Sequence, residues 1–540
     1  MRTNYLLALL SAFLLWVAWP PIPYTAPLLW VGFVPLLLAM EDVMRGQYRK
    51  KGTKIFLLGG STGLLWNTAS IYWVFNSLDA VMPVYAAAFV SLIPFGLAAV
   101  LMAIAFRLYY QLRKRHGIGL SLVGLVCFWI AYEYLHQTWD LAFPWMTLGN
   151  GFASTHQLVQ WYEYTGVFGG TVWIWAPNIL VFLTILSAKD GFAPAHRYKL
   201  LGGLAALILI PSTWSLYRYF SYEEHENPSD VVVVQPNIDP YGKFGFIPPA
   251  EQIEDLIRLS ESVAQPNTEF FIWPETAIAH SFGYDEEQLR QLPIFHRIQD
   301  FLSRYKNSNL LSGIESFRIF PEQHTPTAFE YQGIYYDKYN AAVLIENSAR
   351  LQFYHKSKLV PGVEQTPFGG ALAFMKPLFK AFGGTTGGYG RQEKPSVFYS
   401  QSGIGAAPVI CYESIWGDYV AQYIKQGAQF IAVVTNDGWW GNTSGKDQHL
   451  AYAKLRAIET RRWVARSANT GISAFINQRG DVVQKTKWWV ADAIKQDINL
   501  NEEITCYVKA GDYFAYAGCI GSLVFGLLIV IGRRWRSAKS

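Results

Sequence analysis

The sequence predicts a polytopic α-helical membrane bundle that carries an α/β domain, and three observations support this fold class. Of the 540 residues, 51% are hydrophobic and only 16% are charged, which is too apolar for an ordinary soluble protein. The long apolar stretches lie in residues 1–218 and after about residue 512, whereas residues 229–510 have a mixed composition. In that middle region, short β-rich runs alternate with helical patterns, as they do in α/β proteins.

Eight apolar stretches are long enough to cross a bilayer as helices, because about 17–25 apolar residues suffice. Seven of them precede the globular region and one follows it, at about 4–20, 24–40, 54–76, 83–108, 119–138, 166–187, 198–217 and 514–532. The first stretch resembles a signal peptide, but Pro20-Pro21 and the immediate second span argue against cleavage. We therefore expect a membrane domain over 1–220, a globular domain over 221–511, and a last span with a basic tail over 512–540.

Basic residues follow every second span and predict the orientation of the chain. They gather at 45–54, 113–115, 189–199 and 533–539, whereas the loops at 20–25 and 77–82 carry no Lys or Arg. By the positive-inside rule, both termini are cytoplasmic and the globular domain lies on the outer side of the membrane. The net charge of +5 is modest, and its placement beside the spans indicates membrane topology and not a nucleic-acid partner.

Two features of the membrane region are candidates for a role at the outer surface. Glu133 lies near the outer end of the fifth span, where an intramembrane carboxylate is a functional candidate, although we favour snorkelling to the interface. The loop that contains Trp145 is aromatic, so we expect this indole to face lipid at the level of the headgroups.

The globular region is predicted to be an α/β sandwich. Strands are expected at 231–235, 269–273, 309–313, 341–346, 404–411 and 430–435, and helices at 249–264, 414–427 and 447–460. The strands are nearly continuous apolar runs, which indicates burial on both faces. Ligands in such sheets bind beyond the carboxyl ends of strands. Glu275, Cys411 and Asn436-Asp437 all stand at such ends.

The cysteines predict neither a metal site nor another cofactor. The four of them lack metal-ligand spacing, and Cys127 and Cys519 fall inside apolar segments, where packing roles are expected. A disulfide between Cys411 and Cys506 is possible in an oxidising compartment, but it is the less favoured interpretation.

Cys411 is the candidate nucleophile, with Glu275 and Lys356 as its partners. Free cysteine is mostly protonated near neutral pH, so the thiol needs a base such as Glu275. Lys356 and the N–H of Tyr412 are suited to stabilise the oxyanion of a tetrahedral intermediate. The product is a thioester, the covalent route to acyl transfer. Each residue alone is more often structural, and only their combination in an α/β pattern favours catalysis.

These motifs resemble those of the nitrilase superfamily and, more closely, those of the bacterial apolipoprotein N-acyltransferase family. The matching residues are Trp273-Pro274-Glu275-Thr276, Tyr354-His355-Lys356 with Glu364, Ile410-Cys411-Tyr412-Glu413, and Thr435-Asn436-Asp437 with Trp439 and Gly441. The resemblance covers essentially the whole chain, including the stretch 447–473 and the placement of the spans. It implies a nitrilase-like four-layer αββα sandwich in the periplasm of a bacterium, on a multi-pass protein of the inner membrane.

The resemblance also implies roles for individual residues. The catalytic triad maps onto Glu275, Lys356 and Cys411, and the supporting residues are Tyr412, Glu413, Glu364 and Asn340. Glu364 is expected to orient Lys356 and keep it charged. One departure is Lys243-Phe244, where the family commonly has Lys followed by Trp, which puts any contact of the indole N–H in question.

The substrates implied by the resemblance are both anchored in the membrane. The acyl donor is a phospholipid, typically phosphatidylethanolamine, and the acceptor is the N-terminal amine of the diacylglyceryl-cysteine of an apolipoprotein. The expected enzyme is a monomer that works by a ping-pong route. An active site at the bilayer surface avoids extracting acyl chains, which costs about 0.8 kcal/mol per CH₂.

The segment 368–380 is apolar, punctuated by glycines and basic at two points. We expect it to dip into the interface and gate the pocket, with Phe374 and Phe379 facing lipid; a loop packed on the domain is the alternative. Trp439 and Trp440 are further candidates for contact with substrate or lipid.

Two other functions stay open on the sequence alone. In a membrane-tethered nitrilase-type amidase or hydrolase, water would resolve the thioester. A non-catalytic membrane scaffold would need no triad, and the presence of Glu275, Lys356 and Cys411 argues against it.

Overall fold

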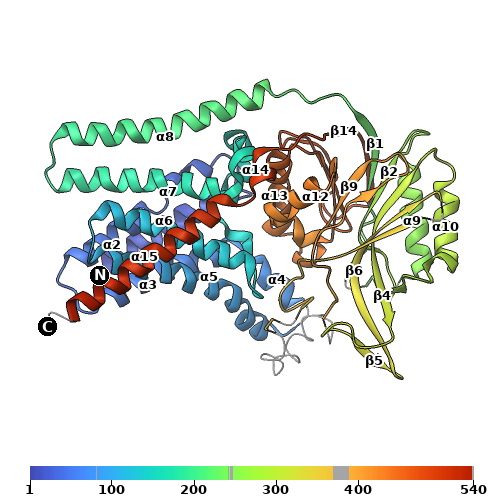
Figure 1. Cartoon of the computed structure of the whole chain (residues 1–540), viewed down its shortest axis with the longest axis horizontal. Helices are drawn as coiled ribbons and strands as arrows, with labels where there is room; N and C mark the ends of the chain where they lie inside the picture. Colours follow the sequence, from blue (N-terminus) through green and yellow to red (C-terminus); the bar gives the residue numbers. More distant parts are fainter. Residues whose placement is uncertain are drawn as a thin grey trace. The chain divides into compact units, whose positions relative to one another are not determined.

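The computed structural model describes residues 1–80, 82–240, 242–243, 247–348, 350–365, 367–368 and 388–537. The chain divides into two compact units (Figure 1). Unit 1 comprises residues 1–75, 83–221 and 510–540, and unit 2 comprises residues 76–82 and 222–509.

Unit 1 is a bundle of helices. Its helical segments are α1 (Arg2–Val17), η1 (Ala26–Trp30), α2 (Val34–Arg45), α3 (Lys51–Ser70), α5 (Val84–Arg113), α6 (Ile118–Thr138), η2 (Pro144–Met146), η3 (Leu148–Val159), α7 (Tyr162–Lys189), α8 (Pro194–Ser221) and α15 (Tyr513–Ser537). Helix α3 packs between α1 and α5, α6 packs between α5 and α15, and α8 runs beside α7 (Figure 1). The short helix α4 (Trp73–Asp79) follows α3.

The bundle is joined by aromatic and polar contacts. Phe33 stacks on Trp175 with ring centroids 4.4 Å apart and meets Trp129 edge to face at 5.1 Å. The Phe33 N–H donates to Asn178 Oδ1 at 2.8 Å, and Asn178 Nδ2 donates to the carbonyl of Leu29 at 2.7 Å. Such side-chain bonds hold apolar helices together where the hydrophobic effect gives little drive.

Six segments in the described part of the chain are long and apolar enough to cross a membrane, fewer than the eight spans expected. They are Ala26–Arg45, Val84–Arg113, Ile118–Thr138, Tyr162–Lys189, Pro194–Ser221 and Tyr513–Ile531. Helix α1 is apolar but has only 16 residues. Helix α3 has 20 residues, yet its lysines, glycines and hydroxyl side chains make it less apolar than these six.

The described residues of unit 2 form two β-sheets. The first is eight-stranded, with the order β14 (Asp492–Asn499), β1 (Pro228–Gln235), β2 (Phe270–Ile278), β4 (Asn309–Phe320), β6 (Ile334–Glu346), β5 (Phe329–Tyr331); β3 (Tyr284–Asp285) pairs with β4 and β7 (Leu351–His355) with β6. The second is six-stranded, with the order β13 (Val482–Lys485), β12 (Ala474–Ile476), β11 (Val464–Ala468), β10 (Phe430–Thr435), β9 (Gly405–Ile410), β8 (Phe398–Tyr399).

The centres of both sheets are parallel. Strands β1, β2 and β4 pair in parallel in the first sheet, and β9, β10 and β11 do so in the second. Every residue of β2, β9 and β10 is buried, as the continuous apolar runs predict. The carboxyl ends of neighbouring parallel strands meet at one edge, which is where polar side chains from distant parts of the chain come together.

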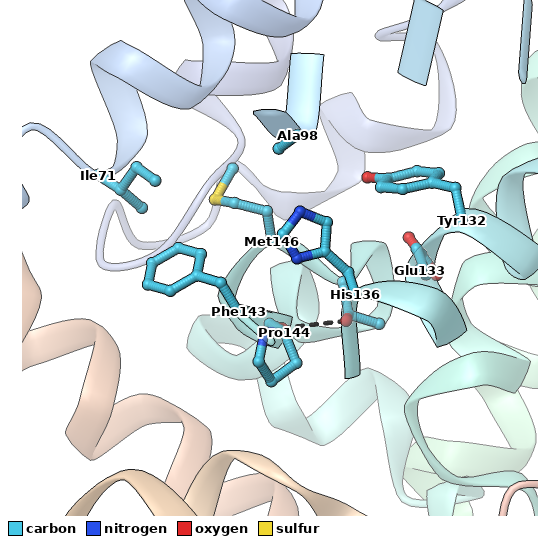
Figure 2. Close-up of a pocket in the computed structure, with 9 residues that line it drawn as sticks. Ile71, Ala98, Tyr132, Glu133, His136, Phe143, Pro144 and Met146 are labelled. Carbon is cyan, nitrogen blue, oxygen red and sulfur yellow. Dashed lines mark hydrogen bonds between the residues drawn. The ribbon is translucent and has the colours of Figure 1, made fainter. Parts of the chain in front are cut away.

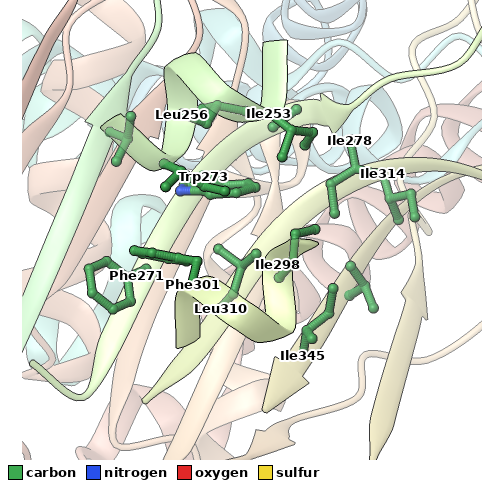
Figure 3. Packing of buried hydrophobic residues seen from close by; sticks show 14 of the residues in the cluster. Ile253, Leu256, Phe271, Trp273, Ile278, Ile298, Phe301, Leu310, Ile314 and Ile345 are labelled. Atoms are coloured by element: carbon green, nitrogen blue, oxygen red, sulfur yellow. The ribbon is translucent and has the colours of Figure 1, made fainter. Parts of the chain in front are cut away.

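The two sheets face each other, and helices cover their outer faces. Across the interface, Phe270 of β2 meets Phe430 of β10 with ring centroids 5.1 Å apart. Helices α9 (Pro249–Glu261) and α10 (Pro293–Leu302) pack on the first sheet through a cluster that includes Trp273, Phe271 and Phe301 (Figure 3). Helices α12 (Gly417–Lys425) and α13 (Ser444–Thr460) contact β9, β11 and β12 of the second sheet. The expected four-layer αββα sandwich is confirmed.

Candidate active site

Glu275 is carried by a bulge in β2. The strand pairs with β4 as far as Trp273, the register then shifts, and pairing resumes at Ile278. Pro274 has no N–H to give to a ladder, which favours a break at this point. On the neighbouring strand, a Cβ added to Gly313 would lie 2.5–2.6 Å from backbone atoms of the bulge. The glycine therefore gives the bulge, and with it Glu275, the room to lie against β4.

Lys356 follows β7 directly and lies between two carboxylates. Its N–H donates to the carbonyl of Asn340 on β6 at 2.9 Å. Its Nζ lies 3.1 Å from Glu275 Oε1 and 2.8 Å from Glu364 Oε1, and the side chain is 1% exposed. Although burial opposes it, the charges of Glu275 and Glu364 raise the pKa of Lys356 well above its ordinary value. The ammonium is therefore a permanent cation at neutral pH.

Asn340 and Glu364 hold this ion pair in place. Asn340 Nδ2 donates to Glu275 Oε1 at 2.8 Å and to Glu364 Oε1 at 2.9 Å. The second oxygen of Glu364 accepts the N–H of Val360 at 2.8 Å. The structure thus brings Asn340 and Glu364, both expected as supporting residues, to the Lys356–Glu275 pair.

Cys411 is the first residue after β9 and begins the 3-10 turn η6 (Cys411–Ile415). Its φ of 49° lies in the left-handed region, which costs a non-glycine residue energy and marks a sharp strand-to-turn corner. Burial and then the charge of Glu275 raise the pKa of the thiol above its ordinary value, whereas Lys356 and the Thr435 hydroxyl lower it. The buried thiol is therefore within electrostatic reach of both partners, and it is protonated at neutral pH.

Glu413 joins the Cys411 turn to the loop that follows β7. One carboxylate oxygen accepts the Tyr354 hydroxyl at 2.6 Å and the Ser357 N–H at 2.7 Å. The other accepts the N–H of Ile410 at 2.9 Å, immediately before the cysteine. Glu413 is fully buried, so its supporting contribution is to fix the distance between the cysteine turn and the lysine loop.

Lys243 is a second buried cation of this site, to which the sequence reasoning gave no role. Its Nζ donates to the carbonyl of Glu275 and to the Thr276 hydroxyl, each at 3.0 Å. Burial lowers the pKa of Lys243 to about 8, against the opposing charge of Glu275. The sequence departs from the family pattern at Lys243-Phe244, but a lysine in a loop gives no sign in the sequence that it is buried.

Four residues that were expected to contact lipid or substrate, Phe374, Phe379, Trp439 and Trp440, stay predictions. Phe374 and Phe379, with the rest of 369–387, lie outside the described residues, as does Phe244. Trp439 is 39% exposed and stands in the 3-10 turn η7 (Asp437–Trp440), beside the partly buried Trp440.

In unit 1, Trp145 does not face lipid as expected. The indole is 0% exposed, because it packs on Trp73 with ring centroids 4.7 Å apart and stacks on Phe143 at 6.1 Å. An aromatic loop at the end of a span is as able to fold onto its own bundle as to enter lipid.

Glu133 does not snorkel to the interface. It is 1% exposed and accepts hydrogen bonds from Trp129 Nε1, the Leu148 N–H and the Thr171 hydroxyl, each at 2.8 Å. Together with His136, also from α6, it lines a small pocket inside unit 1 (Figure 2). Because its three donors come from three segments of the chain, this carboxylate holds those segments of the bundle together.

All four cysteines are free, so the less favoured disulfide between Cys411 and Cys506 is not formed. Cys411 is buried, whereas Cys506 is exposed. The nucleophile candidate therefore keeps its thiol.

Comparison with known proteins gives two matching families. The family described as "Apolipoprotein N-acyltransferase N-terminal domain" matches residues 11–180, and "Carbon-nitrogen hydrolase" matches residues 231–506. The apolipoprotein N-acyltransferase of Chlorobaculum tepidum is 31% identical over 98% of this chain and 96% of its own length. That of Geobacter metallireducens is 27% identical over 98% of this chain and 95% of its own.

Among solved structures, the nitrilase-superfamily protein Nit3 of Saccharomyces cerevisiae is similar at 14% identity. The match covers 52% of this chain and 92% of that protein, with a TM-score of 0.37.

The raised pKa of the Cys411 thiol predicts slow and pH-dependent alkylation. We expect the rate with iodoacetamide to rise about tenfold per pH unit from pH 6 to 9, because only the thiolate reacts. Peptide-level mass spectrometry of the intact protein measures this rate, with the exposed Cys506 as the internal reference. A rate at Cys411 that is independent of pH over this range would contradict a protonated thiol.

The close contact at Gly313 predicts that Gly313→Ala disturbs the bulge. Overpacking of this kind costs roughly 1–3 kcal/mol, so we expect the thermal midpoint of the full chain to fall by about 5 °C. Tryptophan fluorescence during heating measures it. Gly119→Ala is the control, because a Cβ there meets nothing within 4 Å. Equal midpoints for Gly313→Ala and the unsubstituted protein would show that the bulge does not need the glycine.

Proposed function

This chain belongs to the apolipoprotein N-acyltransferase family, and from that premise we propose that it moves a fatty acyl chain from a phospholipid to a lipoprotein. The acceptor is the N-terminal amine of a diacylglyceryl-modified cysteine, and the carrier is a thioester on Cys411. The observation that carries the proposal is the buried Lys356–Glu275 contact of 3.1 Å within electrostatic reach of the Cys411 thiol.

In the acylation step, the sulfur of Cys411 attacks the ester carbonyl of the phospholipid while Glu275 accepts the thiol proton. The C–S bond forms, and the carbonyl oxygen becomes an oxyanion. The Lys356 ammonium and the Tyr412 N–H stabilise that charge, as preorganised donors do in acyl transfer. When the oxyanion collapses, the ester C–O bond breaks and Glu275 returns the proton to the departing lysophospholipid hydroxyl. The acyl group then remains on Cys411 as a thioester.

In the transfer step, the acceptor amine attacks the thioester carbonyl. The N–C bond forms through a second oxyanion held by the same donors, and Glu275 accepts a proton from the amine. The C–S bond then breaks, and the proton passes to the sulfur. The cysteine is regenerated, and the lipoprotein carries a new amide.

The charge balance of the site supports Glu275 as the base. Lys356 stays charged because two carboxylates surround it, so it is suited to stabilise an oxyanion and unsuited to accept a proton. Lys243 Nζ donates to the backbone carbonyl of Glu275 and to the side-chain hydroxyl of Thr276, which fixes the bulge and leaves the carboxylate to face Lys356.

The membrane setting completes the proposal. The protein is embedded in a membrane, with apolar helices long enough to span it. We place it in the bacterial inner membrane with both termini in the cytoplasm and unit 2 in the periplasm, because basic residues gather on alternate connections. Phosphatidylethanolamine is the proposed donor, and the proposed active form is the monomer.

A hydrolase is the alternative function, because unit 2 matches a carbon-nitrogen hydrolase family. The two functions differ in how the thioester is resolved. Water resolves it in a hydrolase, and an amine resolves it in an acyltransferase. The lifetime of the acyl-enzyme with phospholipid alone therefore separates them.

The proposal predicts that Cys411 becomes acylated by phospholipid alone. Purified full-length protein incubated with phosphatidylethanolamine should gain the mass of one fatty acyl chain, and peptide mapping should find it on Cys411. Adding a peptide with an N-terminal diacylglyceryl-cysteine should discharge the thioester within one turnover and leave the peptide N-acylated.

The controls are Cys411→Ser, which should show no thioester, and Cys506→Ser, which should behave as the unsubstituted protein. A thioester that water discharges as fast as the peptide does would establish the hydrolase instead. The absence of any acyl adduct on Cys411 would refute the covalent route.

A further inference from the structure

A chain of buried polar side chains lies behind the nucleophile. The Ser414 hydroxyl donates to the carbonyl of Cys411 at 2.8 Å, and His449 Nε2 lies 2.9 Å from Ser414 Oγ and 3.3 Å from the same carbonyl. His449 Nδ1 lies 2.9 Å from Asp437 Oδ1. Ser414, His449 and Asp437 are at most 1% exposed, so no solvent competes for these contacts.

Asp437, the member of this hydrogen-bonded series farthest from Cys411, is held by the second sheet. Asp437 follows β10, and its second oxygen accepts a hydrogen bond from Arg466 of β11. Arg466 is 0% exposed and also reaches the carbonyl of Ile472 at 3.3 Å. His449 comes from α13, so these hydrogen-bonded side chains connect a helix and two strands to the peptide group between Cys411 and Tyr412.

That peptide group needs support, because Cys411 has a φ of 49°. A residue with a side chain stays in the left-handed region only where the surroundings hold it there. In a trans peptide, the C=O and the following N–H point in opposite directions in one rigid plane. Anchoring the carbonyl of Cys411 on one side therefore fixes the direction of the Tyr412 N–H on the other.

We propose that Ser414, His449 and Asp437 are positioning residues that aim the Tyr412 N–H at the oxyanion formed during acyl transfer. The contacts that carry this role go to the backbone of Cys411: the imidazole faces the carbonyl of Cys411 and the Ser414 hydroxyl. The inference rests on the proposed function, since it requires an oxyanion formed at Cys411. It assigns a task to His449 and Asp437, which lie beside the triad without belonging to it.

The test compares two reactions of the same cysteine in the full-length protein. Acylation by phosphatidylethanolamine passes through an oxyanion, whereas alkylation by iodoacetamide displaces iodide at a saturated carbon and forms none. A single missing oxyanion donor costs about 10²–10³ in rate, and a misdirected one costs less. We therefore expect Ser414→Ala and His449→Ala to lower the maximal single-turnover rate of Cys411 acylation by about 10–100-fold. The lipid concentration that gives half of this rate should stay unchanged.

Alkylation should stay within about twofold of the unsubstituted protein in the same variants, because the thiol itself is untouched. His449→Gln should recover part of the acylation rate, since its amide nitrogen reaches toward Ser414. The matched controls are Ser473→Ala, another buried serine, and Thr460→Ala, which loses a hydrogen bond to the carbonyl of Arg456 on α13. Both controls should acylate at the normal rate.

The outcomes separate this inference from the proposed function. If the unsubstituted protein forms no acyl-Cys411, the proposed function fails, and the inference falls with it. If it acylates normally and Ser414→Ala and His449→Ala match it, only the positioning role is overturned. Loss of alkylation in proportion to acylation would also overturn it, because that result would mean a general structural or thiol effect. His449→Ala is the variant more at risk of misfolding, and the smaller change Ser414→Ala keeps the test decisive.

Discussion

The buried contact between Lys356 and Glu275 is the constraint on which the rest of the site depends. Removing an ammonium and a carboxylate from water costs several kcal/mol per ion unless each finds partners. The structure meets this requirement with Glu364 on the ammonium and with Asn340 on both carboxylates. Three features place the Glu275 carboxylate where the pair can form. They are the bulge of β2, the space that Gly313 leaves beside it and the hydrogen bond from Lys243 to the Glu275 carbonyl.

The two facing sheets explain how residues far apart in the sequence reach one place. Glu275 lies in the bulge of β2 of the first sheet, and Cys411 directly follows β9 of the second sheet. Within each sheet, the parallel strands direct their carboxyl ends to one edge. Glu413 then ties the turn after β9 to the loop after β7, so the nucleophile and the cation are held by a bond between sheets and not by loop sequence.

In unit 1, too, a buried carboxylate holds distant segments of the chain together. Glu133 accepts hydrogen bonds from its own helix, from the first residue of η3 and from α7. In an apolar bundle, where helix contacts gain little from the hydrophobic effect, such bonds select one packing. Buried acids therefore have two tasks in this chain. In unit 1 they join helices, and in unit 2 they balance a cation beside a thiol.

The sequence by itself determined the fold class, because long apolar stretches, buried parallel strands and the polar residues at their ends leave a local pattern. The four layers of unit 2 and the supporting residues Asn340, Glu364 and Glu413 were expected from the family resemblance of its motifs. The tertiary structure alone decided what depends on contacts distant in sequence. It buried Glu133 and Trp145, which had been expected at the membrane surface, and it made Lys243 part of the site. It also placed His449 and Asp437 behind Cys411. A side chain's burial and partners depend on which segments pack on it, and no local pattern encodes that choice.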